Sequence, residues 1–222
     1  MTSAADLLVK TLGPCRVDSP LRSRVESRRT TEHYVGEDDR VLFHDTVSLV
    51  AASGCPVDQL PGLEPAGPRR RIFFDPAKLR VGIVTCGGLC PGINDVIRGL
   101  VMELVFHYGV RHIHGFQNGY QGFVAKYGHD VVDLTPALVS NIDEDGGTIL
   151  GTSRGAQDPH AVVDCLERMN IGALFVIGGD GTLRGAMQIA GVVAARGQKI
   201  AVVGIPKTID NDIPFIDQSF GF

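Results

Sequence analysis

The sequence has no tryptophan, no long apolar run and no excess of basic residues. Its apolar stretches fall short of the ~20 residues that a membrane-spanning helix needs, and its start, MTSAADLLVKTLG, lacks the apolar core of a secretory signal. Lys and Arg number 21 against 25 Asp and Glu, which gives a net charge of −4, unlike the basic surface of nucleic-acid-binding proteins. We therefore expect a cytoplasmic protein that binds neither nucleic acid nor membranes.

The five cysteines are odd in number and scattered along the chain, a usage typical of a reducing compartment rather than of a disulfide scaffold. Cys86 and Cys90 lie close together, but no second Cys or His pair accompanies them. We interpret both as buried thiols rather than zinc ligands.

Glycine is the residue in excess. The chain has 28 glycines in 222 residues, nearly twice the usual share, without a collagen-like period. Hydrophobic residues make up 44% and charged residues 21%, which indicates a folded protein. Glycine at this density predicts tight turns and loops that approach a ligand closely.

The chain divides into two parts of different texture. Residues 1–79 form an irregular N-terminal extension and linker, in which 41–50 is compatible with a strand and the arginines at 69–71 indicate a solvated linker. Residues 80–222 alternate short β-branched runs with amphipathic segments. We predict strands at 81–85, 112–116, 172–178 and 199–205, and helices at 93–109, 159–169 and 183–197. This alternation predicts an α/β fold with a doubly wound parallel sheet and right-handed crossovers.

The first strand runs into the glycine-rich turn 86–92. Gly87 and Gly88 allow close approach of a ligand, and the N-terminus of the next helix favours phosphate. Many α/β turns need glycine for sharp geometry alone, so both interpretations stay open. The turn has neither the Walker pattern nor the G-x-G-x-x-G fingerprint.

The second turn, 178–182, reads GGDGT. A carboxylate beside a phosphate site requires a cation between the two, so Asp180 is interpreted as a ligand of phosphate-bound Mg²⁺. The alternative is an N-capping aspartate with Thr182 in the first helical turn. The flanking glycine pairs exceed what a cap needs and favour the metal.

Two further loops carry residues suited to phosphate chemistry. Lys207, Thr208, Asp210 and Asp212 follow the last strand, where one carboxylate can accept a proton and another can help hold metal and phosphate. Arg154 ends the glycine- and hydroxyl-rich loop 146–154 and suits a phosphate clamp. His112 and His114 lack a matched partner in the sequence and are interpreted as structural.

Five segments resemble the phosphofructokinase family in order and spacing: GIVTCGGLCPGIND, NGYQGF, GGTILGTSR, VIGGDGT and PKTIDNDI. The resemblance covers residues 80–222, and the start VKTLGPCRVDSPL is similar to the long ATP-dependent enzymes of plants and trypanosomatids. It implies transfer of the γ-phosphoryl group of Mg²⁺-ATP to the 1-hydroxyl of fructose 6-phosphate.

The resemblance also implies a role for each candidate residue. Asp210 matches the general base, Arg154 an arginine on the transferring phosphate, and Asp180 the Mg²⁺-associated aspartate. Thr208 and Asp212 match residues at the reacting end of the sugar phosphate. The implied nucleotide contacts are Gly87, Gly88, Tyr120, Arg154, Gly179, Asp180, Gly181 and Thr182, and the implied sugar-phosphate contacts are Lys207, Thr208, Asp210 and Asp212.

The donor is expected to be ATP. Relatives that use pyrophosphate usually carry aspartate at the position of Gly181, where glycine leaves room for the nucleotide α-phosphate. Lys207 is typical of the pyrophosphate enzymes, but the long ATP-dependent forms carry both features. A pyrophosphate-dependent enzyme remains the alternative.

The family's sugar-phosphate domain begins where this chain stops, at FGF. We therefore expect an N-terminal part of the enzyme that is inactive alone and forms a homo-oligomer when full length. The alternative outside enzymology is a fragment that only binds a nucleotide or a protein partner.

Overall fold

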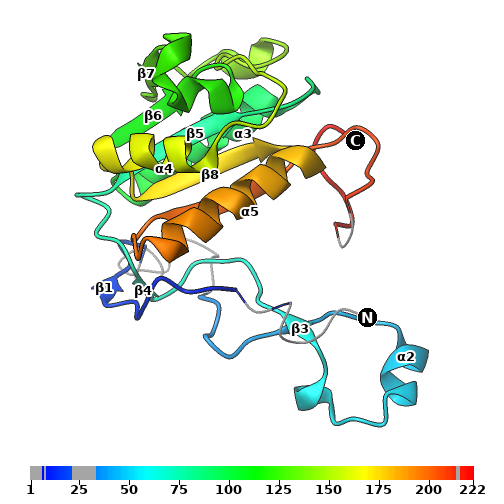
Figure 1. The fold of residues 1–222 in the computed structure, drawn as a ribbon. Helices are drawn as coiled ribbons and strands as arrows, with labels where there is room; N and C mark the ends of the chain where they lie inside the picture. The colour runs from blue at the N-terminus through cyan, green and yellow to red at the C-terminus, as the bar shows by residue number, and fades with distance from the viewer. Residues whose placement is uncertain (1–6, 8, 22–33, 214–215) are drawn as a thin grey trace. The chain divides into compact units, whose positions relative to one another are not determined.

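The computed structural model describes residues 7, 9–21, 34–213 and 216–222. It divides the chain into two compact units, residues 1–73 and 74–222 (Figure 1). None of the helices described in these ranges combines the length and the apolar composition needed to cross a membrane.

The first unit contains short elements. Strand β1 (Val17–Asp18) pairs antiparallel with β4 (Arg71–Ile72), and β2 (Val41–Leu42) pairs antiparallel with β3 (Gly62–Leu63). The remaining elements are helix α2 (Val47–Ala52) and the 3₁₀ turn η2 (Val57–Gln59). A strand over 41–50 is therefore wrong beyond its first two residues. The partner strand is cut short by Pro61 and Pro65, which cannot extend a ladder.

The three arginines at 69–71 make contacts inside this unit instead of forming a solvated linker. Arg69 donates to the carbonyl of Gly36 at 2.5 Å, and the Arg70 guanidinium lies 5.6 Å from the centre of the Tyr34 ring. Arg71 belongs to β4. The basic run thus contributes to the local structure of the extension.

The second unit is built on a five-stranded sheet with the order β7-β6-β5-β8-β9 (Figure 1). Four strands, β6, β5, β8 and β9, run parallel. Their bounds are β5 Arg80–Thr85, β6 His112–Phe116, β8 Ala173–Gly178 and β9 Ala201–Pro206. The predicted α/β sheet and its four strands are confirmed. Strand β9 lies at one edge and exposes Val203 and Gly204.

The other edge departs from the prediction. Strand β7 (Val131–Asp133) pairs antiparallel with β6, in the register His114↔Asp133. His114 Nδ1 lies 2.9 Å from Asp133 Oδ1. His114 is structural as predicted, but the partner that the sequence did not reveal is supplied by this additional strand.

Helices cover both faces of the sheet. The buried side chains of α3 (Ile93–Met102) pack with Val81 and Ile83 of β5, whereas those of α4 (Pro159–Arg168) and α5 (Asp180–Ala195) pack with Val84 on the opposite face. Successive residues of a strand point to opposite faces, so β5 contributes to both layers of core. Helix α3 continues as a π-helical segment, η3 (Glu103–His107), which completes the predicted helix to near Gly109.

Helix α5 begins earlier than predicted. Asp180 is its first residue and Gly179 its N-cap, so 180–182 form the first helical turn rather than a loop. The interpretation of Asp180 as an N-cap is therefore wrong. A Cβ at Gly178 would lie 2.5 Å from the Thr182 hydroxyl. Glycine at 178 thus lets the strand pass directly into the helix.

Candidate functional site

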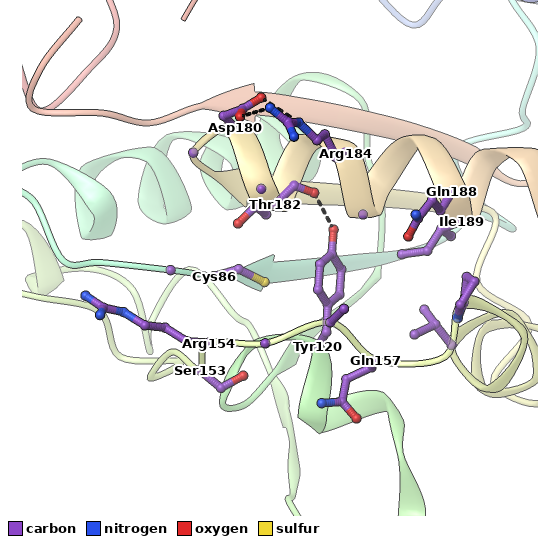
Figure 2. Close-up of a pocket in the computed structure, with 18 of the residues that line it drawn as sticks. Cys86, Tyr120, Ser153, Arg154, Gln157, Asp180, Thr182, Arg184, Gln188 and Ile189 are labelled. Carbon is purple, nitrogen blue, oxygen red and sulfur yellow. Dashed lines mark hydrogen bonds and ion pairs between the residues drawn. The ribbon is translucent and has the colours of Figure 1, made fainter. Parts of the chain in front are cut away.

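A cavity of about 530 Å³ lies at the carboxyl ends of β5 and β8 (Figure 2). Ligands bind at this edge in doubly wound sheets, and small-molecule pockets commonly measure about 300–1,000 Å³. The structure brings nine predicted site residues together in its lining: Gly87, Gly88, Tyr120, Arg154, Gly179, Asp180, Gly181, Thr182 and Lys207.

Two loops are tied together at one wall of the cavity. Gly87 has a φ of +82°, its N–H donates to the Ser153 carbonyl at 3.2 Å, and its own carbonyl accepts from the Thr152 hydroxyl at 2.6 Å. These bonds join the turn 86–92 to the loop 146–154, which carries Arg154. The positive φ explains why this position favours glycine.

Asn94 of α3 fixes the other end of the loop 146–154. Its buried side chain donates to the Asp145 carbonyl at 2.9 Å and accepts from the Ile149 N–H at 3.0 Å. Thr85 adds a bond of 2.7 Å to the Gly151 carbonyl. The sequence analysis missed Asn94, although a buried amide on an apolar helix face is the signal that could have revealed it.

Tyr120, in the 3₁₀ segment η4 (Gly119–Phe123), braces the start of α5. Its hydroxyl donates to the Thr182 carbonyl at 2.8 Å (Figure 2). Burial of the phenol, with a smaller contribution from Cys86, raises the pKa of Tyr120. The side chain therefore acts as a neutral donor that positions the first turn of α5 beside the cavity.

Positive charge collects at one end of the cavity. Lys207 is only 6% exposed, and its ammonium donates to the Gly88 carbonyl. Among the described residues, no carboxylate forms an ion pair with Lys207 or Arg154. A buried, uncompensated cation is costly, and the N-terminus of α5 adds partial positive charge. This end of the cavity is suited to bind an anion.

Asp180 and Arg184 form an ion pair on the first turns of α5 (Figure 2). Arg184 Nη2 lies 2.5 Å from Asp180 Oδ2, and Arg184 Nε lies 3.2 Å from Asp180 Oδ1. Both side chains line the cavity and are largely exposed. Asp180 is the only carboxylate among the described residues that line the cavity, and the Arg184 guanidinium holds both of its oxygens.

The loop after β9 folds back on itself through hydrogen bonds. The Thr208 hydroxyl donates to Asp212 at 2.8 Å and accepts from the Asp210 N–H at 3.1 Å. Asn211 adopts a φ of +50° and accepts from the Ser219 N–H at 3.0 Å. Asp210 and Asp212 are exposed, and these two residues and Thr208 stay outside the cavity lining. The structure therefore brings Lys207 into the cavity but not the three residues that follow it closely.

The opposite end of the cavity is less charged. Gln188 and Ile189 of α5 lie there, away from Asp180 and Arg154 (Figure 2). Gln157 of the segment before α4 also lines the cavity. The sequence analysis missed these residues. Asp180, Arg184 and Gln188 recur every four positions, so the helical period would have placed all three on one face once α5 was known to begin at Asp180.

Comparison with known proteins identifies the family of this chain. The Phosphofructokinase family matches residues 80–222. The chain belongs to the phosphofructokinase family. An ATP-dependent 6-phosphofructokinase of Amycolatopsis methanolica is 55% identical over 217 residues, which cover 98% of this chain and 47% of the relative. The enzyme of the same name from Trypanosoma cruzi is 52% identical over 159 residues, 72% of this chain and 33% of the relative.

The likeness extends to solved structures. A pyrophosphate-dependent phosphofructokinase from Marinobacter aquaeolei superposes with a TM-score of 0.58 at 22% identity, over 64% of this chain and 37% of that chain. At this identity the likeness concerns the fold. This chain spans about half the length of the phosphofructokinase relatives that it matches or less.

The described lining of the cavity contains one carboxylate that could take part in metal binding. Asp180 offers one carboxylate beside the anion-binding end of the cavity, and Mg²⁺ is commonly held by one or two carboxylates together with substrate phosphates and water. Within the described ranges, no group of three or more His, Cys, Asp or Glu side chains could hold a metal ion.

Cys86 and Cys90 are buried, as predicted, and Cys86 lines the cavity. Burial raises the pKa of Cys86 from 9.0 to about 12. Its thiol therefore keeps its proton in the folded state at pH values where the unfolded state loses it, and stability falls as pH rises above 9.

We predict that, between pH 8 and pH 10, the free energy of unfolding falls less in Cys86→Ala than in the unsubstituted chain. The expected difference from the unsubstituted chain is about 1 kcal/mol, the contribution of one thiol with this shift at pH 10. Urea unfolding at both pH values measures it. Cys55→Ala is the control, because Cys55 is exposed; an equal effect of both substitutions would contradict the assignment.

Proposed function

We propose that this chain provides the ATP-binding half of a 6-phosphofructokinase, which transfers the γ-phosphoryl group of Mg²⁺-ATP to the 1-hydroxyl of fructose 6-phosphate. The observation that carries the proposal is Lys207, a buried cation without a carboxylate partner among the described residues, at the anion-binding end of a cavity of nucleotide size. The names of the relatives supply the donor and the reaction class.

In this proposal one end of the cavity binds the phosphates of the nucleotide and the other end binds its base. Lys207, Arg154 and the N-terminus of α5 are placed to neutralise the phosphates. Gln188 and Ile189, at the other end, offer an amide and an apolar surface to a base. Tyr120 holds the helix between these ends. In this reaction a bound Mg²⁺ supplies charge neutralisation on the phosphates.

Asp210 is the proposed general base. Its carboxylate is exposed and has no hydrogen-bond partner among the described residues, and its backbone is fixed by the Thr208 hydroxyl. A free carboxylate on a fixed loop next to the cavity can accept the proton of a sugar hydroxyl. We place fructose 6-phosphate on this side, beyond the cavity that takes the nucleotide.

The length of the cavity favours ATP over pyrophosphate as the donor. Pyrophosphate would occupy the end formed by Lys207 and Arg154 only, whereas the cavity continues along α5 to Gln188 and Ile189. A donor that carries a base can use both ends. The pyrophosphate-dependent reaction is the second candidate, because pyrophosphate could bind at the phosphate end of the cavity alone.

Equilibrium binding tests the nucleotide half of the proposal. Isothermal titration of the 222-residue chain should detect Mg²⁺-ATP, with weaker binding of Mg²⁺-pyrophosphate. Lys207→Met should weaken Mg²⁺-ATP binding at least about tenfold, because removal of a hydrogen-bonded charge on phosphate costs roughly 1.5–3 kcal/mol. The matched control is Lys126→Met, at an exposed position outside the cavity.

Two results would contradict this assignment. One is equal loss of binding in the Lys207 and Lys126 variants while both remain folded by thermal unfolding. The other is tighter binding of Mg²⁺-pyrophosphate than of Mg²⁺-ATP, which would favour the second candidate.

A further inference from the structure

Arg184 occupies the carboxylate that the proposed function assigns to the metal. Its Nε and Nη2 lie 3.2 and 2.5 Å from the two oxygens of Asp180, so the guanidinium fork engages both. Arg184 stands four residues after Asp180 on α5, an orientation in which acidic and basic side chains attract. A metal ion that approaches Asp180 competes with this fork for the carboxylate oxygens, and coordination by both oxygens would require its displacement.

A metal ion alone gains little by that displacement. It would share the end of the cavity with the cations of Arg184, Arg154 and Lys207, and the described residues of the lining offer it no carboxylate besides Asp180. A nucleotide changes the balance, because its phosphate oxygens supply both further metal ligands and a new acceptor for the displaced guanidinium.

We propose that Arg184 is a positioning residue that exchanges partners during ligand binding. It holds Asp180 when no nucleotide is present and turns to a phosphate oxygen when the metal arrives with the nucleotide. The cavity thereby accepts the metal together with the nucleotide rather than before it. This inference rests on the proposed function, since it requires a metal–nucleotide complex at Asp180.

The exchange predicts opposite effects of one substitution. Arg184→Gln removes the competitor for Asp180, so binding of the metal alone should become about threefold to tenfold tighter. The same substitution removes a cation from the phosphates, so binding of the metal–nucleotide complex should become at least about threefold weaker. A residue that only stabilised α5 would shift both affinities in the same direction.

Mn²⁺ is the probe for both measurements. Electron paramagnetic resonance of the 222-residue chain gives the affinity for Mn²⁺ alone, and isothermal titration gives that for Mn²⁺-ATP. Asp180→Asn and the double variant with Arg184→Gln define the part of Mn²⁺ binding that belongs to Asp180. Arg196→Gln is the matched control, because Arg196 lies on the same side of the sheet, pairs with Asp164 at 2.7 Å and does not line the cavity.

Opposite changes in Arg184→Gln that are absent in Arg196→Gln would support the exchange. The gain for Mn²⁺ alone should also be absent when Arg184→Gln is added to Asp180→Asn, and Arg184→Lys should restore part of the Mn²⁺-ATP affinity. An unchanged affinity of Arg184→Gln for Mn²⁺ alone would overturn the inference even if Mn²⁺-ATP binds well. An unchanged affinity for Mn²⁺-ATP would overturn it too. Failure of the unsubstituted chain to bind Mn²⁺-ATP would instead refute the proposed function, and with it the second half of the exchange.

Discussion

Replacement of Asp210 by asparagine is expected to lower turnover by ~10²–10⁴, the usual contribution of a general base. The measurement uses a chimaera in which residues 1–222 are joined to the part of the Amycolatopsis methanolica enzyme that lies outside the matched region. Asparagine keeps the size of the side chain and removes its capacity to accept a proton. The Asp210 carboxylate has no partner among the described residues, so the substitution should leave the loop intact.

A neighbouring carboxylate provides the control for this experiment. Asp217 is also exposed, and its backbone carbonyl, not its side chain, accepts the 2.8 Å hydrogen bond from Asn211. Asp217→Asn should therefore leave both kcat and KM within about twofold. If turnover of Asp210→Asn also stayed within a few-fold in a folded chimaera, the base would have to be sought elsewhere.

The central strands could be predicted because burial on both faces leaves a continuous apolar signal. The run 173–178 is a clear case, with every residue but one buried. Strand β7 could not be recognised, because its two outer residues are exposed and it has only three. Its existence depends on pairing with β6, a tertiary contact that its own sequence does not announce.

The start of α5 shows the limit of turn signals. The GGDGT sequence predicts a turn, yet only Gly178 and Gly179 precede the helix. Glycine was needed at 178 for the contact with Thr182 rather than for a loop. The consequence reaches the site, since the helical position of Asp180 determines its pairing with Arg184.

The cavity-lining residues that belong to short sequence motifs could be predicted. Nine candidate residues converge because the carboxyl ends of neighbouring parallel strands meet at one edge. Asn94 could be recognised as an amide on an apolar helix face, but its backbone partners, Asp145 and Ile149, lie far along the chain and could not be predicted. The functional roles of all twelve candidate residues, the nine in the lining as well as Thr208, Asp210 and Asp212, remain predictions.

Replacement of Gly181 by aspartate is expected to weaken ATP binding by about 10²-fold without loss of stability. A Cβ at this position meets no atom within 4 Å, and an acidic residue is favourable in the first turn of a helix. The new carboxylate would stand beside Asp180 and repel the nucleotide phosphates. Two unit charges ~4 Å apart interact by about 4 kcal/mol near a protein surface, and solvent screening lowers this value.

Gly181→Asn separates charge from size in this test, since the two side chains have nearly the same volume. The affinities for Mg²⁺-ATP and Mg²⁺-pyrophosphate are measured by titration, and thermal unfolding checks that each variant is folded. The affinity for ATP should fall strongly in the aspartate variant and slightly in the asparagine variant. The affinity for pyrophosphate should fall less, because pyrophosphate has no α-phosphate to place beside residue 181. Equal losses in both variants would make the obstruction steric. Unchanged binding of ATP to Gly181→Asp would remove the reason for preferring ATP on the basis of this glycine, and the choice of donor would then rest on the extent of the cavity along α5.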